Sequence, residues 1–426
     1  MRQHLQHKLA RIGGDLVRGL FVALALAVQF AAPASAEPTS VHRKSAAVEA
    51  RRAELKSSGD TTTFVLGLSS GVRAEIFTLA NPYRVVIDLP DVAFELPDGA
   101  GQKKEGLASG FRYGLLSEGK ARIVIDTAGP VLIKKADMRP AGTGKAVDLT
   151  VALSPTSAKA FGGGTGGSQT TQVAATPAPD AGPATVSKRH RTKPVILIDP
   201  GHGGIDPGAA SATNLKEKVV VLAVAKALKT QLEKSGRYDV RMTRSTDVFI
   251  SLDQRLQMSR ELDADLFVSL HADAIAQKRA KSVRGATVYT LSEKASDEEA
   301  QVMAEKENNS DAIAGLQTAH FEEGGDVRNI LIDLLKRETS NFSADFSNTL
   351  VKQLKSAVSL SQRPQRSAAF KVLRQADTPS VLVELGYMSH PEDEKLLKSS
   401  SWQRRVATSI TNAVDQYFSK RTARVR

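Results

Sequence analysis

The stretch ILIDPGHGGIDPGA, residues 196–209, decides the fold of the larger part of this 426-residue chain. An apolar run that reads as a buried strand ends at Asp199 and Pro200, and His202 then stands among glycines. An amphipathic helical pattern follows at once, in LKEKVVVLAVAKALKTQLEKSG. A strand, a glycine-rich turn and a helix are typical of an α/β unit with a parallel sheet. The turn either happens to contain a histidine or keeps space clear around a ligand.

The same alternation continues to residue 420. Further strands are expected in YDVRMTR, DLFVSL, GATVYTL and SVLVEL, and further helices in SLDQRLQMSREL and WQRRVATSITNAVDQYF. We therefore predict an α/β domain over residues 194–420, with a mainly parallel sheet flanked by helices and a basic tail at 421–426. Ligands of such domains bind beyond the carboxyl ends of the strands.

The preceding part of the chain has a different pattern. Six short, β-branched segments between residues 61 and 153 predict a small all-β sandwich: TFVLGLS, RAEIFTL, YRVVIDLP, ARIVIDTAG, VLIKKADM and AVDLTVAL. Two of them are near copies, residues 84–88 and 122–126, which suggests two related half-sheets. Residues 37–60 show no sustained period and read as a mobile lead-in, and the Gly- and Pro-rich residues 154–193 read as a flexible linker.

The first 36 residues have the pattern of a secretory signal peptide. Four basic residues precede the apolar run LFVALALAVQFAA, and small residues end at Ala36, after which we expect cleavage. A membrane anchor is the alternative, but the run is short for a span. No later segment is apolar enough to cross a membrane, and the chain has no cysteine, so any metal site must use His, Asp or Glu. The net charge of +12 suggests an anionic partner, whereas the basic and aromatic pattern of nucleic-acid-binding modules is absent.

Four side chains suited to metal chemistry are expected at one edge of the predicted sheet. His202 and His271 each follow a strand, Glu384 lies near the end of the last strand, and Glu217 opens the helix after the glycine loop. Two histidines and a carboxylate can hold a catalytic Zn²⁺ and leave a position for water, and a second carboxylate can transfer the proton. We expect one zinc per chain, bound by His202, Glu217 and His271, with Glu384 as the acid/base. Taken singly, His202 could be a turn residue, His271 a strand-end histidine and Glu217 a helix-start acid. Glu384 is the least ordinary of the four, because a buried strand should not carry an unpaired carboxylate.

These motifs resemble those of a known family. VILIDPGHGGIDPGA, DLFVSLHADA, AEKENNSD and PSVLVELGYMSHPEDEKLL are similar to segments of the zinc-dependent N-acetylmuramoyl-L-alanine amidases of bacterial cell division, and residues 61–153 resemble the peptidoglycan-binding AMIN domain. The resemblance implies a periplasmic enzyme, enriched at the division site, that cleaves the amide between N-acetylmuramic acid and L-alanine. It places the zinc ligands at His202, Glu217 and His271 and the catalytic glutamate at Glu384. The glycines beside His202 would then let the backbone and a bulky substrate approach the metal.

An acidic residue interrupts the apolar face of a helix in the insertion at 293–340. Ser296 and Glu299 form a candidate capping box, and Ala300, Met303 and Ala304 mark an apolar stripe whose next position is Glu307. Glu307 is either solvated at a fraying helix end or inserted into the cleft as an extra zinc ligand. The resemblance favours the second reading, because division amidases carry an autoinhibitory helix here and are activated by partners with LytM-type domains. A second apolar stripe at 329–337 is either core or a docking surface.

The leading hypothesis is therefore a regulated zinc amidase, monomeric, that acts on peptidoglycan during daughter-cell separation. Two alternatives remain open from the residues alone. A zinc peptidase that cuts within the stem peptide would have the same metal site. An inactive peptidoglycan-binding protein is less compatible with the intact set of four residues.

Overall fold

The computed structural model describes residues 48–142, 144–161, 191–275, 283–316, 329–375 and 377–425, with side chains left undescribed at 329–335 and 422–425. The expected signal peptide lies wholly outside the described residues, and so does most of the expected linker. Most side chains of the apolar stripe at 329–337 are likewise outside the described part. Within the described part, no helix has the length and apolar character needed to cross a membrane.

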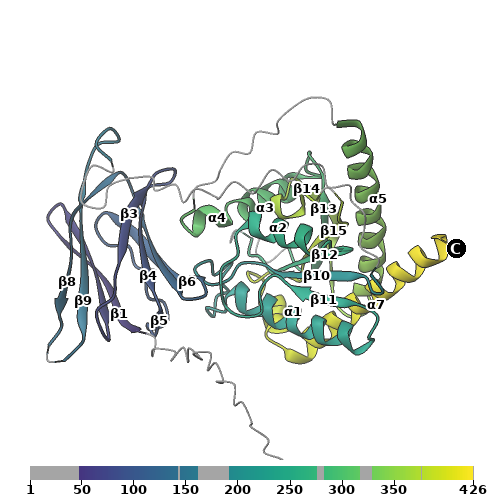
Figure 1. The fold of residues 1–426 in the computed structure, drawn as a ribbon, viewed down its shortest axis with the longest axis horizontal. Coiled ribbons are helices and arrows are strands. Elements are labelled where there is room, and N and C mark those ends of the chain that lie inside the picture. The colour runs from purple at the N-terminus through teal and green to yellow at the C-terminus, as the bar shows by residue number, and fades with distance from the viewer. Residues whose placement is uncertain are drawn as a thin grey trace, which may run out of the picture. The chain divides into compact units, whose positions relative to one another are not determined.

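The C-terminal domain is built on a six-stranded sheet (Figure 1). Its strands lie in the order β11-β10-β12-β15-β13-β14. All neighbouring pairs are parallel except β13 with β15, which are antiparallel. The bounds are β10 Val195–Pro200, β11 Asp239–Met242, β12 Leu266–His271, β13 Ala286–Leu291, β14 Leu360–Ala368 and β15 Ser380–Glu384. The structure thus confirms the predicted α/β class, and β14 is a strand that the sequence did not predict.

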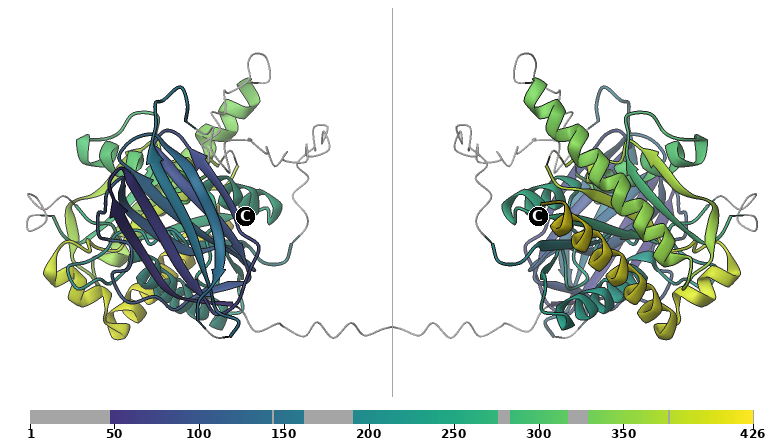
Figure 2. Two further views of the ribbon diagram at one scale, coloured as in Figure 1. Left: turned by 90° about the vertical axis from the view of Figure 1, so that its left-hand side faces the viewer. Right: turned by 90° about the vertical axis from the view of Figure 1, so that its right-hand side faces the viewer.

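Helices cover both faces of this sheet. On one face, side chains of α1 (Glu217–Lys234), α5 (Asn329–Leu354) and α7 (Ser400–Val425) pack on inward residues such as Ile198 and Val268. On the other face, α2 (Leu252–Glu261) and α3 (Glu298–Asn308) pack on residues such as Leu197 and Phe267. Figure 2 shows α5 and α7 lying side by side. Two short helices, α4 (Ser310–Ile313) and α6 (Pro391–Leu397), and a 3₁₀ turn at Lys371–Leu373 complete the domain.

The N-terminal domain is an all-β sandwich of two sheets, as predicted, and its neighbouring strands are antiparallel except β5 with β1, which are parallel. One sheet has the order β5-β1-β2-β9-β8 and the other β3-β4-β7-β6. Its core comprises inward residues of both sheets, among them Phe64, Ile87 and Ile125. The bounds are β1 Val48–Ser58, β2 Thr61–Leu68, β3 Glu75–Leu79, β4 Arg84–Pro90, β5 Val92–Phe94, β6 Ala108–Ser117, β7 Lys120–Thr127, β8 Val131–Pro140 and β9 Val147–Pro155.

Two expectations about the N-terminal domain were wrong. Residues 48–58 of the expected lead-in form β1, and a bulge between Ala50 and Arg52 breaks the alternation that would have revealed the strand. The near copies at 84–88 and 122–126 are not equivalents in two half-sheets. They are β4 and β7, antiparallel neighbours in one sheet. The expected basic tail is helical as far as Val425, because α7 continues through it.

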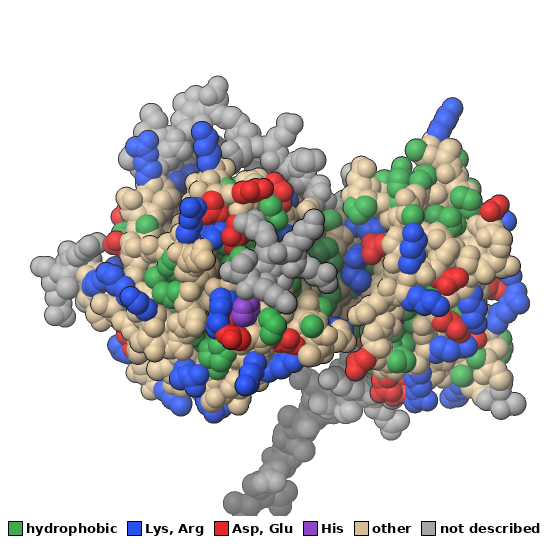
Figure 3. All heavy atoms as spheres, turned by 180° about the vertical axis from the view of Figure 1, so that it is seen from behind, with side chains coloured by type: hydrophobic (Ala, Val, Ile, Leu, Met, Phe, Trp, Pro, Cys, Tyr) green, Lys and Arg blue, Asp and Glu red, His purple; other side chains and the backbone are tan. Residues whose placement is uncertain are grey.

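Positive charge is spread over the one face that Figure 3 draws. On the face drawn in Figure 3, Lys and Arg side chains alternate with acidic ones. The net charge of +12 therefore does not gather into one basic patch on this face.

Candidate metal centre

His202 lies in a tight turn directly after β10. Its backbone has a positive φ of 57°, and its carbonyl accepts a hydrogen bond from Arg255 Nη2 at 2.9 Å. A Cβ added to Gly201 would lie 2.4 Å from Cε1 of His271, so a glycine is required there for the two histidines to approach. The space beside His202 is thus filled by protein. The glycine at 201 thus permits the close backbone approach that was expected, and the approach of a substrate stays a prediction.

A buried ionic network supports the same turn. Asp199, fully buried, accepts hydrogen bonds from Thr243 Oγ1 at 2.6 Å and Ser269 Oγ at 2.7 Å, and it pairs with Arg255. Burial alone would raise the pKa of Asp199, but Arg255 and the two hydroxyl donors outweigh burial and lower it. Arg255 also donates to the Pro200 carbonyl at 3.0 Å. The network therefore ties the end of β10 to α2 and sets the position of the turn.

Glu217 is the first residue of α1 and is completely buried. Both of its oxygens are oriented by backbone amides: Oε2 accepts from Ala209 N and Oε1 from Ala272 N, each at 2.8 Å. A Cβ on Gly208 would lie 2.7 Å from Glu217 Oε2, so the loop before α1 also needs glycine. These contacts orient the Glu217 carboxylate so that its Oε1 faces the two histidines.

His271 and Glu384 are opposite each other on neighbouring strands. They pair in the register of β12 with β15, at the carboxyl ends of both strands. Glu384 is completely buried; its Oε2 accepts from Asp273 N at 3.0 Å, while Oε1 has no hydrogen-bond partner among the described residues. A buried carboxylate oxygen without a partner is costly and marks a place where another group is expected.

Glu307 lies on the apolar face of α3 and is only 5% exposed. The alternative of a solvated residue at a frayed helix end is therefore wrong. The expected capping box is wrong as well, because Asp297 is the N-cap and accepts from Ala300 N at 3.0 Å. Ser296 is engaged elsewhere, since its hydroxyl accepts from Ser367 N at 3.2 Å.

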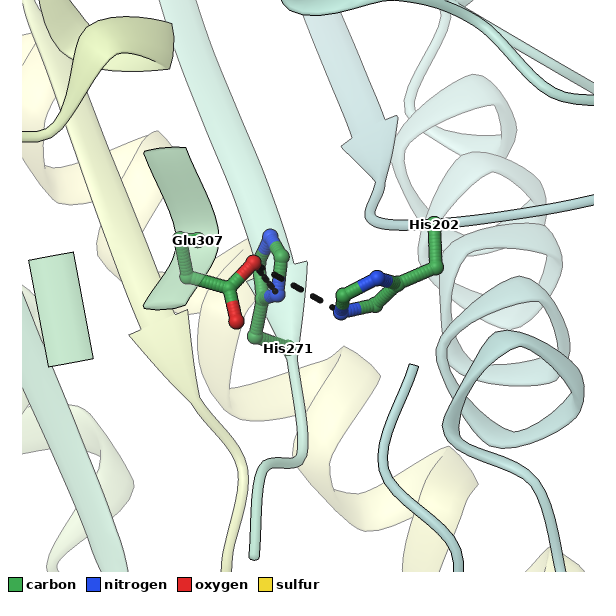
Figure 4. Close-up of side chains that lie close together, drawn as sticks. All are labelled: His202, His271 and Glu307. Atoms are coloured by element: carbon green, nitrogen blue, oxygen red, sulfur yellow. Dashed lines mark ion pairs between the residues drawn. The ribbon is translucent and has the colours of Figure 1, made fainter. Parts of the chain in front are cut away.

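Four of the predicted side chains meet around one point. His202 Nε2 lies 3.2 Å from Glu217 Oε1 and 3.6 Å from Glu307 Oε2. His271 Nδ1 lies 3.3 Å from Glu217 Oε1 and 3.2 Å from Glu307 Oε2. Both ring nitrogens are buried and make no hydrogen bond to any described residue. Figure 4 shows the two rings and the Glu307 carboxylate directed toward one another, an arrangement able to hold a metal ion.

The electrostatics of this cluster reflect crowded negative charge. Burial raises the pKa of Glu384, and the nearby Glu217 and Glu307 carboxylates raise it further, well above its usual range. Burial also opposes ionisation of Glu217, but His202 and His271 together outweigh this effect and hold the pKa of Glu217 well below its usual range. Burial alone would lower the pKa of His202, but neighbouring carboxylates, Asp206 first among them, raise it well above its usual range. A bound divalent cation would offset this excess of buried acid.

Sequence reasoning missed one carboxylate that contacts the site. Asp206 Oδ2 lies 2.8 Å from His202 Nδ1, and its Oδ1 accepts from Gly208 N at 3.0 Å. Carboxylates commonly orient a metal-binding histidine in this way. The available signal was an acidic residue four positions after His202 within the same glycine-rich loop.

Comparison with known proteins gives the family. The family profile described as N-acetylmuramoyl-L-alanine amidase matches residues 196–416, and the AMIN domain profile matches residues 52–149. The chain belongs to the N-acetylmuramoyl-L-alanine amidase family. It is 35% identical to N-acetylmuramoyl-L-alanine amidase AmiC of Neisseria meningitidis serogroup B, over 84% of this chain and 87% of that protein.

A further relative and a solved structure are similar to parts of this chain. AmiA of Escherichia coli K12 is 38% identical over 54% of this chain and 78% of its own length. A solved structure of an amidase from Clostridium difficile 630 is 24% identical and covers 54% of this chain and 98% of its own, with a TM-score of 0.38. The chain is therefore an AMIN-containing amidase that acts on peptidoglycan, and the resemblance seen in its motifs is confirmed. The AMIN domain and the AmiC and AmiA relatives indicate a periplasmic enzyme.

Proposed function

We propose that this amidase is a zinc enzyme kept inactive by its own α3 until a partner displaces that helix. The observation that carries the proposal is the set of separations around the site, 3.2–3.6 Å between the histidine nitrogens and the two carboxylate oxygens. Tetrahedral zinc with ligand bonds of about 2.0–2.2 Å separates its ligand atoms by about 3.3–3.6 Å. His202, Glu217 and His271 would hold the metal, and Glu307 would occupy its fourth position.

The reaction is hydrolysis of the amide that joins the lactyl group of N-acetylmuramic acid to L-alanine. Zinc bound here would polarise the scissile carbonyl and lower the pKa of the attacking water. Glu384 takes a proton from that water on Oε1, the oxygen left free by the bond from Asp273 N to Oε2. It returns the proton to the nitrogen of L-alanine as the carbon–nitrogen bond breaks, which yields a lactyl carboxylate and a free stem peptide.

The dimensions of the site support inhibition. The cavity lined by His202, His271 and Glu307 has a volume of about 10 Å³, which is room for at most one water molecule. A glycan with its peptide cannot enter it while α3 is in place. Asn308 holds the helix by accepting from Lys371 N at 2.7 Å, and Lys306 forms an ion pair with Asp273. The inhibitory carboxylate is therefore preorganised, which gives it a high effective concentration at the metal.

Regulation and targeting follow from the same proposal. A partner with a LytM-type domain, as the family resemblance implies, would activate the enzyme by binding better when α3 is displaced. The AMIN domain would bind the wall, the first 36 residues would direct export with cleavage after Ala36, and the enzyme would act as a monomer at the division site in daughter-cell separation.

The decisive experiment compares Glu307→Ala with Glu305→Ala, an exposed glutamate on the same helix. Cleavage by the zinc-loaded proteins is followed without any partner, and products are identified by mass spectrometry. We expect Glu307→Ala to release stem peptides beginning at L-alanine much faster than wild type, and Glu305→Ala to match wild type. Equal rates in all three proteins would remove the inhibitory role, and cleavage between stem residues would remove the assigned bond.

A further inference from the structure

The centre of the outer face of the AMIN sheet β3-β4-β7-β6 is buried, although a sandwich sheet of this kind usually has one face in water. Val86 in β4 and Val124 in β7 point away from the sandwich core and are completely buried. They form an apolar cluster with Ala314, Ile205 and Phe249 of the amidase domain. What covers this AMIN face therefore includes the chain just after α4, which follows the helix that carries Glu307.

Three arginines on this face bind the end of that same segment. Arg122 Nη1 donates to the carbonyls of Ala314 and Gly315 at 3.0 and 3.2 Å, and Arg112 Nη2 donates to Ile313 at 3.3 Å. Arg84 donates to the carbonyl of Ala312. The last carbonyls of a helix have no partner within it, and cationic donors are favourable there. The arginines thus complete the hydrogen bonds at the end of α4.

The arginine that makes two of these bonds is itself held rigidly. Arg122 is 5% exposed, and Asp88 accepts from its Nε at 2.5 Å and its Nη2 at 2.8 Å. Gly315, with a φ of +72°, turns the chain against the valines, and a Cβ there would lie 3.2 Å from Val86 and 3.3 Å from Val124. The contact is therefore specific in both charge and shape.

A second contact joins the same sheet to the loop that carries His202. The carbonyl of Leu115 in β6 accepts from Ile205 N at 3.2 Å and from Phe249 N at 3.3 Å. A Cβ on Gly114 would lie 2.4 Å from the carbonyl carbon of Gly204, so the two backbones touch closely. The AMIN sheet therefore contacts both the metal-site loop and the inhibitory segment.

We propose that this AMIN face is a docking surface for residues 312–315 and thereby stabilises the inhibited position of Glu307. The inference rests on the proposed inhibition by Glu307. Residues 308–311 link Glu307 to residues 312–315 and are themselves held in place, since Asn308 Nδ2 donates to the carbonyl of Ala369 and Asp311 Oδ1 accepts from Leu252 N. Separation of the AMIN sheet from residues 312–315, for example when the domain engages the wall, removes part of what holds α3. Wall binding and activation are then linked, because a ligand that prefers the separated state shifts the population toward it.

The test uses the full-length zinc-loaded chain and a soluble muropeptide substrate, so that tethering to the wall does not affect the rate. Arg122→Lys keeps the charge beside Asp88, but one ammonium cannot serve both Asp88 and two carbonyls. Gly315→Val perturbs the contact from the other side. Arg139→Ala is the control, because Arg139 lies on the other AMIN sheet and is largely exposed.

We expect both contact variants to raise the partner-free rate by about tenfold, which corresponds to about 1.4 kcal/mol, while Arg139→Ala leaves it unchanged. Hydrogen exchange in residues 298–316 should rise in the same two variants. In a Glu307→Ala background neither substitution should add anything, because the inhibition is already gone.

The inference is overturned if the contact variants keep the wild-type rate and exchange while Glu307→Ala is activated. If Glu307→Ala is itself no faster than wild type, the proposed inhibition fails and this inference fails with it, a result distinct from the first. Zinc content and circular dichroism show whether each variant is folded.

Discussion

The carboxylate of Asp206 should control how tightly the site holds its metal. It is buried beneath His202, with one oxygen 2.8 Å from Nδ1 of the ring and the other accepting from Gly208 N at 3.0 Å. In Asp206→Asn, the amide oxygen can still accept from the ring. The NH₂ group then faces the Gly208 N–H, so two donors oppose each other at that short distance.

Loss of such an orienting carboxylate typically lowers metal affinity by about 10–100-fold, or about 1.4–2.8 kcal/mol. We expect the loss of zinc affinity in Asp206→Asn to lie within this range and the loss in Asp206→Ala to lie toward its upper end, since alanine supplies no acceptor. Affinity is measured by competition with a chelator of known zinc affinity at fixed pH. Asp247→Asn is the control, because Asp247 also binds the loop, through Gly204 N, but is about half exposed and lacks contact with His202.

Equal zinc affinity in wild type and Asp206→Asn, with equal melting temperatures of the metal-free proteins, would refute this reasoning. A lower melting temperature with unchanged affinity would mean that Asp206 stabilises the loop without acting on the metal.

Three further outcomes are expected. His202→Ala and His271→Ala should each bind little zinc by metal analysis, and full occupancy in both would exclude them as ligands. Glu384→Gln should retain its zinc but lose about 10²–10⁴-fold in hydrolysis, as is typical for a general acid/base; an active variant would contradict that role. Asp199→Ala should destabilise the metal-free protein by about 3–5 kcal/mol in denaturant unfolding, because it leaves a buried guanidinium unpaired, whereas Asp239→Ala, which breaks a solvent-accessible ion pair with Arg241, should change stability by at most about 1 kcal/mol. Because folding lowers the pKa of Asp199, its contribution is present above the unfolded-state pKa of about 3.9 and is lost as the pH falls through the lower folded value.

The fold and much of the site could be predicted because their signals are local. The buried strand before His202 and the helix that opens at Glu217 each show in a short window of residues. The carboxyl ends of parallel strands share one sheet edge, so His271 and Glu384 were expected together, and the structure pairs them in register. Their roles in binding zinc and moving protons remain proposals.

Other features could not be predicted because they depend on partners distant in sequence. The strand at 48–58 was missed since its bulge disrupts the period of two. The N-cap of α3 is Asp297, one residue after the expected Ser296, because the Ser296 hydroxyl accepts a hydrogen bond from Ser367 N in β14, a strand that was not expected. The packing partners of the loop glycines could not be predicted because the groups that crowd them, such as the His271 ring against Gly201, come from elsewhere in the chain.

Two local conflicts in the sequence are resolved by the same segment. A carboxylate at Glu307 contradicts the apolar stripe of α3, and the uninterrupted apolar runs around Val86 and Val124 contradict the alternation of a half-exposed sheet. Natural sequences break local rules mainly at functional sites. Residues 298–316 explain both conflicts, because Glu307 contacts the histidines and Ala314 packs against Val86 and Val124. A stable sandwich and a stable α/β domain would require neither a carboxylate at position 307 nor apolar residues at positions 86 and 124. The presence of both features therefore favours selection for a segment that is held by the histidines at Glu307 and by the AMIN sheet at Ala314.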